Sequence, residues 1–115
     1  MTTNLNASAS VTLDASGAGT VTLGPGSQPG TQVWNVDGLL WTQNNAARIG
    51  KTPIPRIVIY QDTASPSNLQ AQSYDGSFGS ASGSLTLQKG AALIAVFTGG
   101  QAGDSLAFTV TGTKG

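Results

Sequence analysis

Two stretches, AALIAVFT at residues 91–98 and LAFTVT at residues 106–111, decide the fold class. In the second stretch large apolar side chains alternate with small or polar ones, which is the pattern of a strand with one buried face. Similar patterns, punctuated by glycine, recur along the chain, and no segment has the period of a long helix. We therefore predict an all-β, two-layer antiparallel β-sandwich of about eight short strands, jelly-roll or immunoglobulin-like in topology.

Turn residues separate the other predicted strands. Val11–Leu13 and Val21–Leu23 flank the turn Asp14–Gly17, and we interpret them as a hairpin. The section rich in Ser, Gly and Asn between residues 62 and 90 offers only short strands, around Leu69–Tyr74 and at Leu85–Leu87. We expect one sandwich domain at residues 10–115, preceded by a polar N-terminal arm at residues 1–9.

The segment from Thr31 to Thr42 is apolar between Val33 and Trp41 except at Asn35, Asp37 and Gly38. Local chemistry leaves two alternatives open, a hairpin at Asp37-Gly38 or one long strand with a bulge there. Trp34 and Trp41 are seven residues apart, so in an unbulged strand they would point to opposite faces. One of the two indoles would then be partly exposed.

Charge and composition exclude most catalytic chemistry. The chain has 5 basic and 5 acidic residues, all of the acids being aspartate, and it has no cysteine and no histidine. Catalytic triads and zinc sites of the usual kinds cannot be built from this set, and a neutral chain lacks the electrostatic attraction that nucleic acids require. We predict a protein that is not an enzyme and that has no cofactor, no metal site, no nucleic-acid partner and no membrane partner.

Two predicted strands are apolar on both faces. Ile57 and Ile59 alternate with Val58 and Tyr60, and the strand Leu93–Phe97 is apolar throughout. A two-layer sandwich covers only one face of each sheet, so long loops or a neighbouring subunit must cover the other. We expect a partner protein, bound by the arm at residues 2–9 and by eight side chains. These are Leu39, Trp41, Arg48, Lys51, Arg56, Val58, Tyr60 and Ile94.

Several short segments together resemble small virion proteins of tailed bacteriophages that infect actinobacteria. The resemblance spans about residues 10 to 113. It rests on Gly17–Pro25, Val33–Val36, Ile59-Tyr60, Ser67–Leu69, Leu87–Gly90, Ala95–Gly100 and Val110–Gly112.

The resemblance implies a β-sandwich in or on a phage particle, as a capsid decoration or minor capsid protein or a small tail component. We expect a capsid decoration protein that binds the major capsid protein, stabilises the head, and forms a homo-oligomer, with a trimer as one alternative. The first ten residues have no signal-peptide pattern, so we expect assembly in the host cytoplasm and a final location on the virion surface. The resemblance also favours the bulge at Asp37-Gly38 over the hairpin.

Two rival functions follow from particular residues. A carbohydrate-binding or host-attachment module of the phage tail would use Trp41, Tyr60 or Tyr74 as a stacking platform. A hydrolase or lyase would have to use Asp62 and Asp75, but we interpret the aspartates as turn-capping residues.

Overall fold

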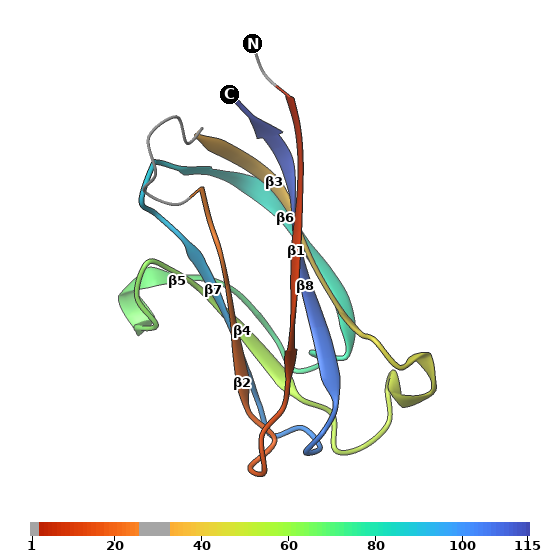
Figure 1. Ribbon diagram of the computed structural model, residues 1–115. Coiled ribbons are helices and arrows are strands. Elements are labelled where there is room, and N and C mark those ends of the chain that lie inside the picture. The colour runs from red at the N-terminus through yellow and green to blue at the C-terminus, as the bar shows by residue number, and fades with distance from the viewer. Residues whose placement is uncertain (1–2, 26–32) are drawn as a thin grey trace.

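The computed structural model describes residues 3–25 and 33–115, and within them eight strands form two four-stranded antiparallel sheets (Figure 1). Sheet A has the strand order β1-β8-β3-β6, and sheet B has the order β2-β7-β4-β5. The predicted all-β, two-layer sandwich is therefore confirmed. Along the chain the elements are β1 (Thr3–Thr12), β2 (Gly19–Leu23), β3 (Trp34–Gln43), the 3-10 helix η1 (Ala46–Arg48), β4 (Arg56–Gln61), the 3-10 helix η2 (Pro66–Asn68), β5 (Leu69–Ser73), β6 (Phe78–Leu87), β7 (Leu93–Thr98) and β8 (Ser105–Lys114).

The strand order distinguishes the jelly roll from the immunoglobulin-like alternative. The strands pair from the two ends of the chain inward, β1 with β8, β2 with β7, β3 with β6 and β4 with β5. Winding one long antiparallel hairpin into two packed sheets produces this nested pairing, which defines a jelly roll. β1 and β2 lie in different sheets, so the predicted hairpin between them is wrong. Alternating side chains mark a strand but do not identify its neighbour, and here the turn carries the chain from one sheet to the other.

The predicted N-terminal arm is also wrong for the residues that the structure describes. Residues 3–9 belong to β1, which pairs with β8 in unbroken register from Thr3 opposite Lys114 to Thr12 opposite Ser105. Leu5 is 4% exposed and is part of the core, while Ala7 and Ala9 pack against it. The small side chains at the inward positions hid this alternation from the sequence analysis.

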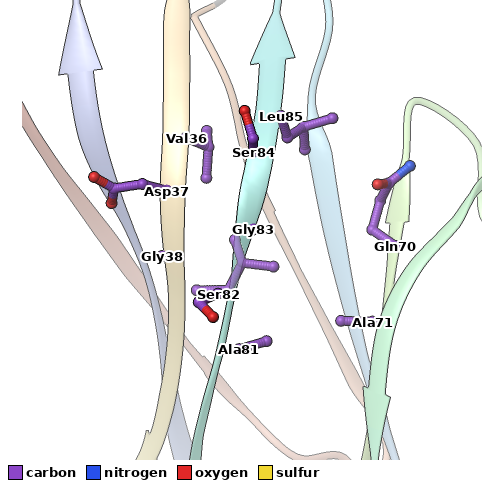
Figure 2. A pocket seen from close by; sticks show the side chains of 11 residues that line it. Val36, Asp37, Gly38, Gln70, Ala71, Ala81, Ser82, Gly83, Ser84 and Leu85 are labelled. Carbon is purple, nitrogen blue, oxygen red and sulfur yellow. The ribbon is translucent and has the colours of Figure 1, made fainter.

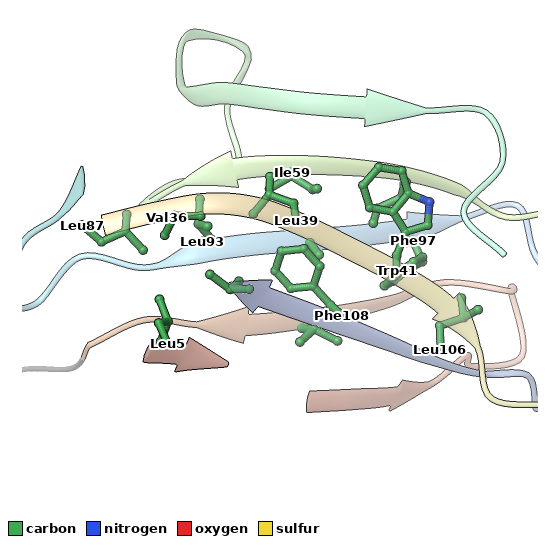
Figure 3. Close-up of a cluster of buried hydrophobic side chains, with 14 of the residues drawn as sticks. Leu5, Val36, Leu39, Trp41, Ile59, Leu87, Leu93, Phe97, Leu106 and Phe108 are labelled. Atoms are coloured by element: carbon green, nitrogen blue, oxygen red, sulfur yellow. The ribbon is translucent and has the colours of Figure 1, made fainter. Parts of the chain in front are cut away.

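The core lies between the two sheets (Figure 3). The central strands, which have neighbours on both sides, contribute most of its fully buried side chains; Leu87 of the edge strand β6 is fully buried as well. Sheet A provides Leu106, Phe108 and Val110 from β8, and sheet B provides Ile57, Ile59, Leu93, Ala95 and Phe97 from β4 and β7.

A bulge in β3 turns both tryptophans toward the core. β3 is one continuous strand, and its register with β8 shifts between Val36 and Gly38, so that Asp37 is an extra residue. The bulge alternative is therefore confirmed; residues 31–32 of the predicted strand lie outside the described residues. The extra residue reverses the alternation, and Trp34 and Trp41 consequently face the same side despite their odd spacing.

Candidate interaction surfaces

The outer face of sheet B carries an apolar row that we call the sheet B face, made of Val58, Tyr60, Ile94 and Val96. These residues alternate with the fully buried inward residues of β4 and β7, and each of the four is half-buried. Val58 lies opposite Val96, and Tyr60 lies opposite Ile94, so the four side chains form one block on the central strands. Sheet A packs on the other face of sheet B and leaves this block uncovered by a second layer.

Polar side chains border the sheet B face. On the β2 side, Thr20 and Thr22 lie beside Val96 and Ile94 and are exposed. Arg56 is exposed at one end, where its guanidinium carbon lies 5.2 Å from the ring centroid of Tyr74 and its Nη2 donates to Oε1 of Gln72 at 2.6 Å. Val58, Tyr60, Ile94 and Arg56, four of the eight predicted contact residues, are thus brought together.

Leu39 and Trp41 were predicted as partner contacts, and the structure contradicts this. Leu39 is 8% exposed and Trp41 is 4% exposed, because the bulge turns both inward. The indole Nε1 of Trp41 donates to the backbone oxygen of Asp75 at 2.9 Å, and the absence of a side chain at Gly79 leaves room for the ring. Trp41 can serve neither as a protein contact nor as a sugar platform.

The basic residues of the connection between β3 and β4 lie away from the sheet B face. Arg48 forms an ion pair with Asp104, with its Nε 3.3 Å from Oδ1 and its Nη2 3.1 Å from Oδ2. This pair joins η1 to the turn before β8, so Arg48 already has an acidic partner within the chain, and its predicted contact with an acidic partner surface stays a prediction. Lys51 is exposed in the same connection, and its predicted contact stays a prediction.

The outer face of sheet A is mostly polar and uncharged. Along β1 and β8 it presents hydroxyl and amide side chains, among them Asn6, Ser8, Ser10 and Thr109. Leu40 and Phe78 are exceptions, 43% and 62% exposed, and they border a shallow pocket of about 280 Å³. The sequence analysis missed Leu40, since only a bulge at Asp37 places this residue outward.

A second pocket, of about 180 Å³, opens between the edge strands β6 and β5 (Figure 2). It lies at the bulge, where Gly83 and Ser84 together oppose the single residue Asp37 and β6 bends away from β3. Ala71 lines it from sheet B. Its lining carries one carboxylate and no basic group, which is too little for acid–base chemistry.

The predicted capping of a local turn is confirmed for Asp14 and Asp75 but is wrong for Asp37, Asp62 and Asp104, whose carboxylates accept from residues far away in the sequence. The Oδ1 atom of Asp14 accepts from the hydroxyl of Ser16 and from the backbone N–H groups of Ala18 and Ser16, and these bonds hold the pKa of Asp14 below its usual 3.8. Asp62 accepts from the N–H of Ala92. Asp75 accepts from the N–H and hydroxyl of Ser77.

Asp62 and Asp75 do not form a pair. Asp62 follows β4 and Asp75 follows β5, and because these strands are antiparallel neighbours the two aspartates lie at opposite ends of β5. The rival hydrolase or lyase mechanism needs both carboxylates at one substrate bond, and the fold does not bring them together. Among the described residues no group of three or more potential metal ligands occurs.

The described part of the chain has no helix that is long and apolar enough to cross a membrane. Comparisons with protein-family models, with curated proteins and with solved structures found no match for this chain.

Proposed function

We propose that this chain is a non-enzymatic structural protein of a bacteriophage virion, a capsid decoration or minor capsid protein that binds the major capsid protein through the sheet B face. The observation that carries the proposal is the half-buried block of Val58, Tyr60, Ile94 and Val96 on an outer face of the sandwich. A sheet face that meets only water is expected to be polar, as the outer face of sheet A largely is.

The surroundings of the block agree with a protein partner. An apolar centre with a polar rim is the common anatomy of protein interfaces, and here Thr20, Thr22 and Gln72 supply the rim. Tyrosine and arginine are enriched among residues that dominate binding, and Tyr60 and Arg56 lie on this face. The jelly roll occurs in viral capsid proteins and also in lectins, so the fold alone does not choose between them. The resemblance to small virion proteins favours a role in a phage particle over a lectin-like role.

The test is co-sedimentation with empty phage heads that were assembled without this protein. Val96→Lys places a charge at the centre of the proposed interface and is expected to weaken binding by at least about tenfold. Ser80→Lys is the matched control, because Ser80 is an exposed strand residue on the outer face of sheet A. Val96→Thr keeps the shape of the side chain and takes the place of Val96→Lys in the test if Val96→Lys does not fold. Equal binding by Val96→Lys and the unaltered chain, or equal loss with Ser80→Lys, would contradict the proposal.

A second candidate function, carbohydrate binding in a tail or host-attachment structure, is favoured by one observation. Tyr74 is 84% exposed, the guanidinium of Arg56 lies over its ring, and Arg56 in turn donates to the side chain of Gln72. The guanidinium of Arg56 occupies one side of the ring and leaves the other for a sugar. Glycan binding that is lost in Tyr74→Ala but kept in Val96→Lys would support this function over capsid binding.

A further inference from the structure

The free edge of β1 has none of the features by which sheet edges usually avoid pairing with other chains. Short strands, charged side chains, proline and bulges are the usual protections. β2 and β5, the edges of sheet B, are short strands of 5 residues each. β6, the second edge of sheet A, is bent by its register shift against β3.

β1, by contrast, is 10 residues long and contains no charge, no proline and no glycine. Its register with β8 is unbroken, and in the part of the chain that the structure describes no strand pairs with its other side (Figure 1). Every second backbone N–H and C=O group of β1 therefore points away from the sheet, ready to bond with an added strand.

We propose that β1 pairs with β1 of a second copy of this chain, antiparallel about a twofold axis at Ser8, so that sheet A continues across a dimer. In β1, from Leu5 to Val11, the odd-numbered residues point inward and the even-numbered ones outward. Two copies of β1 can therefore form one continuous sheet only when odd-numbered residues lie opposite odd-numbered residues. Centring the pair on Ser8 places Leu5 opposite Val11 and Ala7 opposite Ala9 on the inward face.

The outward face is equally self-complementary in this register. Asn6 lies opposite Ser10, and Ser8 lies opposite its own copy, so amides and hydroxyls meet each other in both halves. No like charges meet, since the strand has none, and such repulsion would disfavour a symmetric pair. A register centred on Ala7 would instead place Leu5 opposite Ala9, which buries less apolar surface than a contact of Leu5 with Val11.

The dimer goes beyond the proposed function and does not depend on it, because it uses the edge of sheet A, whereas capsid binding is assigned to the sheet B face. The absence of native cysteine permits a direct test by single-cysteine cross-linking. Directly opposed antiparallel residues have Cα atoms about 4.5–5.5 Å apart, within the range that a disulfide spans.

Oxidation of Ser8→Cys is expected to convert most of the protein to a disulfide dimer. Ser10→Cys alone should form no cross-link under the same conditions, whereas a mixture of Ser10→Cys with Asn6→Cys should cross-link. Ser82→Cys, an exposed serine on the β6 edge, is the matched control and should not cross-link.

Two further variants test the contact without chemistry at sulfur. Ser8→Lys brings two ammonium groups together at the axis and should weaken self-association about fivefold or more, as measured by analytical ultracentrifugation, while Ser82→Lys should leave it unchanged. A monomeric native chain, no cross-link in Ser8→Cys, or preferential cross-linking of Ser82→Cys would overturn the proposal. The last result would place the contact at β6.

Discussion

Deletion of Asp37 tests whether one extra residue sets the phase of β3. Without it, Val36 and Leu39 are two residues apart, so regular alternation in unbroken register with β8 keeps Leu39 and Trp41 inward and Leu40 outward. Leu39 and Trp41 are 8% and 4% exposed, and burial of such side chains contributes about 1.5–3 and 3–5 kcal/mol. The deletion keeps this burial, so its expected cost is that of the acceptor which Asp37 offers to the Thr111 hydroxyl, less than about 1 kcal/mol. A loss of about 3–5 kcal/mol, a large part of the stability of a small domain, would mean instead that the strand after Val36 had turned over.

Urea unfolding monitored by tryptophan fluorescence measures this loss and also reports where Trp41 lies. We expect a midpoint close to that of Asp37→Ala, with no red shift of the folded-state emission and no stronger acrylamide quenching. Asp37→Ala is the control, because it keeps the number of residues and removes only the exposed acceptor of the Thr111 hydroxyl, an effect of less than about 1 kcal/mol. The reasoning is refuted if the deletion variant is about 3–5 kcal/mol less stable than Asp37→Ala, or if its tryptophan emission shifts to the red.

Three further predictions concern single contacts. Gly112→Ala should lower the thermal midpoint strongly, since Gly112 has φ +150° and a Cβ there would clash with the backbone oxygen of Asn35; Gly83→Ala, with open space around it, should be nearly neutral in the same calorimetric scan. Arg48→Met should cost about 1–3 kcal/mol in urea unfolding by leaving the carboxylate of Asp104 unpaired, and an unchanged midpoint would contradict that role. The folded-state pKa of Asp14 is lowered, so its charge stabilises the fold above a pH of about 4. The difference in free energy of unfolding between the native chain and Asp14→Asn should therefore shrink as the pH falls below this value. A difference that does not change with pH would show that the charge plays no part.

The sandwich class and the positions of most strands could be predicted from residue patterns, because alternation reflects which side chains must leave water. The block on the sheet B face could be predicted for the same reason, since Ile57–Tyr60 and Leu93–Phe97 carry apolar side chains at every position. Leu39 and Trp41 were assigned to the surface wrongly, and the ion pair of Arg48 with Asp104 was not predicted. The ion pair joins residues 56 positions apart, and the bulge is defined by how β3 pairs with its neighbouring strands. Neither can be read from a short stretch of sequence.

Most of β6 is a strand that its own sequence does not predict. Its sequence FGSASGSLTL has little intrinsic preference for a strand, and only its last residues, Leu85–Leu87, were expected to form one. It is extended over all 10 residues because β3 offers it backbone partners. The local sequence thus determined that this chain forms strands and which side chains must be hidden, since hydrophobicity belongs to each residue. Which strands become neighbours, and therefore which edge is left free and which indole is buried, was decided only when distant segments met, because hydrogen-bond partners and register belong to pairs of strands.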